Sequence, residues 1–164
     1  MNRRSWLLTL GALLSTKPRA FAAGALIPLD ETAFREMVAA HRGKVLLVDF
    51  WATWCSSCRE EMPKLIALFD AQKRKGFDLV TISCDEPEQA LAAAQFVERQ
   101  RAPTPHYVRH AKSDDDFINA IDARWSGALP ALFLFNREGK QVQEFIGETD
   151  EKVLETAINK VLSA

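Results

Sequence analysis

The chain has 164 residues, enough for one domain with a substantial hydrophobic core. Without the first 22 residues, which carry four basic and no acidic side chains, it has 17 basic against 22 acidic residues, a net charge of about −5. This balance excludes nucleic acid and anionic membrane surfaces as expected partners, and three cysteines are too few for a disulfide-stapled scaffold.

Residues 1–22 have the pattern of a secretory signal peptide. Arg3 and Arg4 precede a nine-residue, mainly apolar segment, and a small-x-small sequence ends at Ala22, the expected cleavage site. A membrane-spanning helix would need about 20 apolar residues, more than this segment provides. We therefore expect residues 23–164 to form an exported domain without a stable membrane anchor. The paired arginines also resemble a twin-arginine signal, so both the general secretory route and the twin-arginine route stay open.

The first elements expected in the exported part are a helix and a buried strand. Asp30 is placed to cap a helix that ends near Gly43. From Val45 to Trp51 the chain is apolar except for Asp49, a pattern typical of a strand buried on both faces of a parallel or mixed sheet.

A Cys-x-x-Cys sequence, Cys55-Ser56-Ser57-Cys58, follows this strand and begins the next helical pattern. At this spacing the first turn of a helix brings two sulfurs within disulfide reach, and the helix N-terminus favours thiolate over thiol. The pair therefore predicts thiol–disulfide exchange. Half of a zinc site or a plain structural staple is the alternative, but Cys84 and the three histidines provide no second pair at metal-binding spacing, so no metal site is predicted.

Helical and strand patterns alternate along the rest of the chain. The helix that starts at Ser56 is expected to reach about Lys75, with Pro63 inside it. Cys84, at the end of the second strand, is interpreted as a buried, small apolar residue. The further expected elements are a strand at 77–84, helices at 85–101 and 113–121, a short strand at 107–108, a hairpin at 131–146 and a last helix from 150.

This order of elements resembles the thioredoxin fold. The match is most specific at Val48–Cys58 and at Gly127-Ala128-Leu129-Pro130. It implies an α/β, thioredoxin-like fold: a mixed central sheet with helices on both faces, a terminal β-hairpin and a C-terminal helix. An expected αβ insertion at about 86–124 and the sequence Glu61-Met62-Pro63 resemble the exported thiol:disulfide reductases of the TlpA/ResA kind.

The resemblance, together with the thiol chemistry, assigns roles to the residues of the motifs. Cys55 is the expected nucleophile, and Cys58 the resolving thiol that forms the Cys55–Cys58 disulfide. The peptide bond between Leu129 and Pro130 matches the family's cis-proline site, where an extended substrate peptide binds opposite the cysteines; an ordinary trans proline is the alternative. Trp54 is expected to form a contact surface beside the nucleophile.

Two acids are candidates for proton transfer. Burial should raise the pKa of Asp49, and in thioredoxins the acid at this position is a proton relay behind the resolving cysteine. The alternative is an Asp49 carboxyl that is hydrogen-bonded by a neighbouring hydroxyl such as that of Thr81. Glu61 matches a carboxylate that tunes the thiols in the TlpA/ResA group, or else it is an exposed helix acid beside Lys64.

The sequence therefore predicts a periplasmic, monomeric thiol:disulfide oxidoreductase that needs no cofactor. It would reduce disulfides of other exported proteins, as in cytochrome c biogenesis, and would be recharged by a membrane-embedded thiol reductant. A protein disulfide oxidase or isomerase is the alternative within enzymes. A copper- or zinc-binding chaperone that uses the Cys-x-x-Cys sequence is the alternative from another class.

Overall fold

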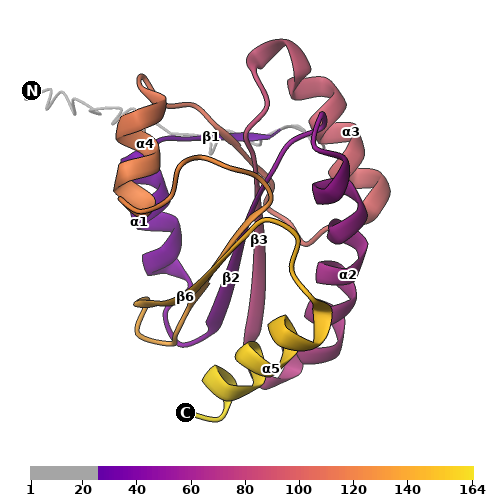
Figure 1. Cartoon of the computed structure of the whole chain (residues 1–164), viewed down its shortest axis with the longest axis vertical. Coiled ribbons are helices and arrows are strands. Elements are labelled where there is room, and N and C mark those ends of the chain that lie inside the picture. Colours follow the sequence, from indigo (N-terminus) through magenta and orange to yellow (C-terminus); the bar gives the residue numbers. More distant parts are fainter. Residues whose placement is uncertain (1–25) are drawn as a thin grey trace, which may run out of the picture.

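A six-stranded mixed sheet lies between two layers of helices in the computed structural model, which describes residues 26–164 (Figure 1). The predicted signal peptide lies outside the described residues. The strands are β1 (Ile27–Leu29), β2 (Val45–Trp51), β3 (Phe77–Ser83), β4 (Tyr107–Arg109), β5 (Ala131–Phe135) and β6 (Gln141–Ile146); the helices are α1 (Glu31–Ala40), α2 (Ser56–Gln72), α3 (Ala90–Gln100), α4 (Asp114–Ile121) and α5 (Glu151–Leu162), with 3₁₀ turns at Lys73–Lys75 and Pro87–Gln89.

The strands are ordered β1-β4-β3-β2-β5-β6. The first four are parallel to one another, whereas β5 runs antiparallel to both β2 and β6. All seven residues of β2 are buried because β2 has a partner on each side and helices on both faces. The predicted mixed sheet and its terminal hairpin are thus confirmed. The edge strand β1 was not predicted, because it has three residues and one of them is Pro28.

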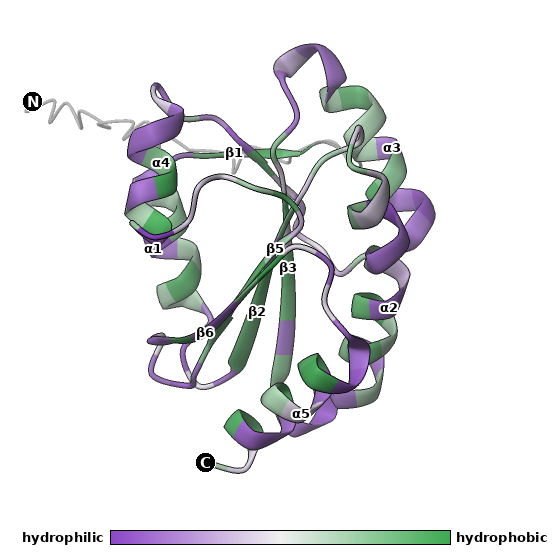
Figure 2. Cartoon of the chain, in the orientation of Figure 1, coloured by the Kyte–Doolittle hydropathy of each residue, from purple (hydrophilic) through white to green (hydrophobic). Residues whose placement is uncertain are grey.

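Alternate residues of the central strands pack against different helices. One core cluster joins α1 and α4 to one face of the sheet, and a second cluster joins α2 and α5 to the other. Figure 2 shows the central strands mostly in the colour of hydrophobic residues, with hydrophilic residues on the outer sides of the helices. Val45 and Leu47 of β2 pack in the cluster with α2, so Asp49, two residues on, also faces α2.

Side chains cap four of the helices, and the predicted cap at Asp30 is one of them. Asp30, Ser113 and Asp150 accept N–H groups of the first turns of α1, α4 and α5. The fourth cap, at α2, is the sulfur of Cys55. Among residues 26–164, no helix combines the length and the apolar character that a membrane span requires.

Candidate active site

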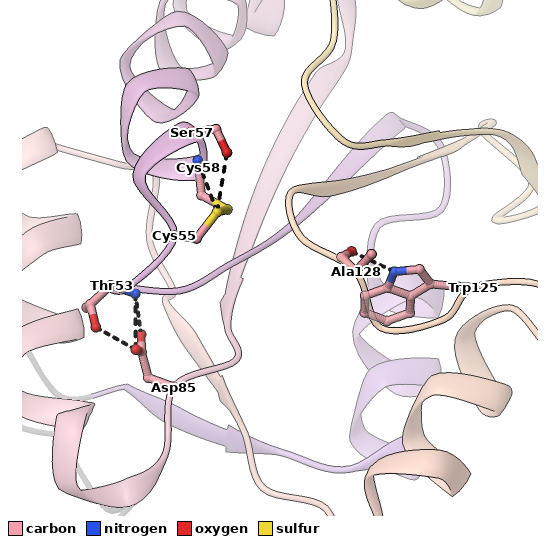
Figure 3. The surroundings of a disulfide bond; sticks show 7 residues. All are labelled: Thr53, Cys55, Ser57, Cys58, Asp85, Trp125 and Ala128. Carbon is pink, nitrogen blue, oxygen red and sulfur yellow. Dashed lines mark hydrogen bonds between the residues drawn. A yellow bond between two sulfur atoms is a disulfide. The ribbon is translucent and has the colours of Figure 1, made fainter.

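Cys55 and Cys58 form a disulfide at the N-terminus of α2 (Figure 3). Cys55 precedes the helix with extended backbone, and its Sγ accepts the N–H of Cys58 at 3.2 Å. The hydroxyl oxygen of Ser57 lies 3.6 Å from the same sulfur. After reduction, these donors and the positive end of the helix would stabilise a thiolate at Cys55. Cys55 is 7% exposed and Cys58 2%, so the predicted nucleophile is the more accessible of the two.

A short turn connects β2 to the disulfide. The N–H of Cys55 donates to the carbonyl oxygen of Ala52 at 3.1 Å. Between these residues, the N–H of Thr53 donates to both carboxylate oxygens of Asp85 at 3.0 Å, and the Thr53 hydroxyl donates to one of them at 2.6 Å (Figure 3). The sequence had placed Asp85 at the start of a helix, and this contact was missed. The sequence does contain a feature that could have indicated this contact. Asp85 and the hydroxyl residue Thr53 each lie just beyond the end of one of two neighbouring parallel strands.

The loop before β5 lies against the disulfide. The peptide bond between Leu129 and Pro130 is cis, as the resemblance implied, and Leu129 packs against the core cluster that contains both cysteines. The indole N–H of Trp125 donates to the carbonyl oxygen of Ala128 at 2.9 Å and so fixes this loop (Figure 3).

The surface beside Trp54 is recessed and of mixed polarity, since Glu86, Arg109 and Asp114 line it together with apolar residues. Trp54 is 61% exposed although it is a large aromatic residue. Together with Leu129, Cys84 and Trp125 it lines a cavity of about 210 Å³. An exposed tryptophan next to a reactive sulfur fits the predicted contact surface for a protein substrate.

Asp49 is 2% exposed, and its Oδ2 atom has no hydrogen-bond partner among the described residues. It lies beside Thr81 in the β2–β3 pairing, but the Thr81 hydroxyl is likewise buried and unpartnered. The alternative of a carboxyl satisfied by Thr81 is therefore wrong. Burial, and secondarily the charge of Glu61, raise the pKa of Asp49 well above its usual value.

Glu61 lies one turn after Cys58 and is partly buried, with Oε2 lacking a partner in the described part of the chain. Burial is the main cause that raises its pKa to about 7; Lys64 and the Thr149 backbone N–H lower it, and Glu148 raises it. Because it is partly buried, Glu61 is not the simple exposed helix acid beside Lys64 that was the alternative. A carboxyl that titrates near neutral pH can accept and return protons during thiol chemistry.

Cys84 is partly exposed rather than fully buried as expected, and it packs against the core cluster under α1 and α4. Although the residue as a whole is partly exposed, its thiol group is buried, and this burial raises the pKa of Cys84 to about 12. At neutral pH it is therefore a protonated, weakly nucleophilic thiol.

Comparison with known proteins agrees with this geometry. The sequence model of the Redoxin family matches residues 29–162. The thiol-disulfide oxidoreductase ResA of Bacillus cereus is 32% identical over 120 residues, which cover 73% of this chain and 65% of ResA, so the chain spans just under two thirds of that relative. ResA of Geobacillus thermodenitrificans is 30% identical over 136 residues, which cover 80% of this chain and 74% of the relative.

A solved structure shows the same fold. The crystal structure of a thiol:disulfide interchange protein of the thioredoxin family from Chlorobium tepidum is similar with a TM-score of 0.62 and 22% identity, covering 76% of this chain and 83% of that one. The chain therefore belongs to the Redoxin family, is similar to the ResA proteins and has a thioredoxin-like fold.

Proposed function

We propose that this protein is an exported thiol:disulfide oxidoreductase that reduces disulfide bonds of other exported proteins. The observation that carries the proposal is the Cys55–Cys58 disulfide at the N-terminus of α2, with the Cys58 N–H donating to the sulfur of Cys55. The names of the ResA relatives, thiol-disulfide oxidoreductases, support the same activity. The signal-peptide pattern of residues 1–22 supports export to the periplasm.

The reaction proceeds in two thiol exchanges. The Cys55 thiolate attacks one sulfur of the partner's disulfide, forms a mixed disulfide and releases the partner's other sulfur as a thiolate. Cys58 loses its proton and attacks the sulfur of Cys55, which re-forms the Cys55–Cys58 disulfide and releases the second partner thiolate. In balance, the partner gains two electrons and two protons, and the dithiol loses them. A membrane-embedded thiol donor would return these electrons.

The neighbouring groups have separate tasks in this scheme. Asp49 faces α2, the helix that carries Cys58, and with its raised pKa it would take the proton of Cys58 in the second exchange. Glu61, whose pKa is about 7, would pass protons between Asp49 and solvent. Trp54 and the segment Leu129-Pro130 would hold the partner's extended chain beside the sulfur of Cys55.

The redox potential tests the direction of electron flow. Equilibration of the Cys55–Cys58 pair with glutathione buffers, read by alkylation and mass spectrometry, should give a potential below about −200 mV, as for reducing members of this fold. Turnover with a protein disulfide such as that of insulin should require both cysteines, with Cys84→Ala as the matched control. A potential near about −120 mV would favour the oxidase alternative instead.

A further inference from the structure

Asp85 is a buried acid outside the set of residues that the reaction scheme uses. It follows β3 and is 1% exposed. Its carboxylate accepts the N–H and the hydroxyl of Thr53 (Figure 3). It also accepts the hydroxyl of Ser83 at 2.7 Å. In the described part of the chain, no lysine, arginine or histidine forms a salt bridge with Asp85. Burying a carboxylate that has only neutral hydrogen-bond donors costs more free energy than burying an apolar residue at the same position. We therefore expect the hydrogen bonds of Asp85 to have a role that an apolar residue could not perform.

These hydrogen bonds hold the turn that carries the nucleophile. Thr53 is two residues before Cys55, in the turn closed by the N–H of Cys55 on the carbonyl oxygen of Ala52. The end of β2 is bound separately to the next strand, since the N–H of Cys84 donates to the carbonyl oxygen of Trp51 at 2.7 Å. Asp85 is therefore the side chain that binds the turn itself to the sheet.

The contact matters most after reduction. In the oxidised protein the covalent bond to Cys58 holds the sulfur of Cys55 at the helix N-terminus. In the dithiol that bond is absent, and the place of the sulfur near the Cys58 N–H then depends on the Cys55 backbone. That backbone is held on one side by the Arg59 N–H, which donates to the Cys55 carbonyl oxygen at 3.2 Å, and on the other side by the turn. A sulfur that moves away from the helix N-terminus loses the N–H donor and the positive end of the helix, both of which favour its thiolate.

We propose that Asp85 is a positioning residue, which holds the Thr53 turn so that the reduced Cys55 sulfur stays at the N-terminus of α2. This inference rests on the proposed function only in taking Cys55 as the nucleophile. The inference can be tested through the reactivity of the Cys55 thiol alone. The result then does not depend on whether the protein reduces other proteins.

The test compares Asp85→Ala with the isosteric Asp85→Asn in the reduced full-length protein. Asparagine keeps an acceptor for the N–H and hydroxyl of Thr53, while its amide N–H₂ can donate to the hydroxyl oxygen of Ser83; alanine removes the whole anchor. Alkylation of Cys55 by iodoacetamide, in which the thiolate displaces iodide, gives a rate constant and a pH profile. We expect Asp85→Ala to shift the midpoint of the pH profile upward and so to slow alkylation at pH 7 about tenfold, and Asp85→Asn to stay within about threefold of the wild type at that pH.

The matched control is Asp78→Ala at the opposite end of β3. Asp78 accepts Lys44 and the N–H of Leu79, so its removal also deletes a charge and two hydrogen bonds, and it should leave the alkylation rate unchanged. If Asp85→Ala is too unstable to purify, Thr53→Val removes the 2.6 Å hydroxyl donor and keeps the side-chain shape. We expect that variant to react about threefold more slowly.

Three results would overturn the proposal. The first is a folded Asp85→Ala protein that is alkylated within twofold of the wild-type rate. The second is equal slowing in Asp85→Asn and Asp85→Ala, because the asparagine oxygen still accepts from Thr53 and that variant should therefore be much less affected. The third is an unchanged rate in Thr53→Val where that variant replaces Asp85→Ala. A merely structural role would lower the melting temperature of Asp85→Ala without shifting the pH profile of alkylation in the folded protein.

Discussion

Replacing Glu61 with glutamine should make the protein more stable at alkaline pH but not at acid pH. Burial raises the pKa of this carboxyl from the usual 4.5 to about 7, so between these values the folded protein holds a proton that the unfolded chain has lost. The stability of the wild type must then fall as pH rises through this window, and the loss is complete above about pH 7. Glutamine is neutral throughout and lacks this dependence.

The size of the effect follows from the same pKa. A change from 4.5 to about 7 corresponds to about 3.4 kcal/mol for a fully buried group. Glu61 is only partly buried, so solvent screening reduces this to about 1–2 kcal/mol. The charge of Glu61 also raises the pKa of Asp49, and its removal therefore adds to the gain in the same direction.

Urea unfolding of the oxidised proteins at pH 4 and pH 8 measures this effect. We expect the difference in unfolding free energy between Glu61→Gln and the wild type to be about 1–2 kcal/mol more favourable at pH 8 than at pH 4. Glu60→Gln, an exposed acid on the same helix, should show no such change. A Glu61→Gln difference that is the same at both pH values, within about 0.5 kcal/mol, would refute the reasoning.

Three further predictions concern other parts of the site. Asp49→Asn should slow the attack of Cys58 on the mixed disulfide by about 100-fold, because the buried proton acceptor is lost, while the first exchange changes little; the lifetime of the mixed disulfide, read by acid quench and mass spectrometry, checks this. Trp54→Ala should change the unfolding free energy by less than about 0.5 kcal/mol but raise KM for a protein disulfide, whereas Trp51→Ala, at a fully buried position, should lose about 3–5 kcal/mol. Because its pKa is about 12, Cys84 should stay unmodified at pH 8 under conditions that alkylate Cys55 completely, as peptide mapping would show.

Local patterns in the sequence were enough to predict the elements that hold the disulfide. The apolar run of β2 and the Cys-x-x-Cys sequence place the sulfurs at a strand end and a helix start, and both features are properties of neighbouring residues. The cis peptide bond before Pro130 came from the family resemblance instead, because no property of Leu129 and Pro130 alone favours it.

The parts that were missed depend on contacts between distant segments. Asp85 binds Thr53 across 32 positions of the chain, and a helix-start pattern at Asp85 gave no sign of this. Strand β1 is defined by its pairing with β4, more than 70 residues later, rather than by its own three residues. Likewise, the partly exposed Cys84 lines a cavity together with residues distant in sequence, such as Trp54 and Leu129. These three features arise when distant segments come together in the folded sheet, so local sequence patterns do not reveal them.

The central claim is that Cys55 attacks a partner disulfide and Cys58 resolves the product. The most direct measurement uses reduced Cys58→Ser protein mixed with a peptide disulfide, followed by digestion under acid conditions and mass mapping of the adduct. The account predicts one stable mixed disulfide per chain, at Cys55, and none in a Cys55→Ser, Cys58→Ser double variant. An adduct at Cys84, or no adduct on a folded Cys58→Ser protein, would contradict it.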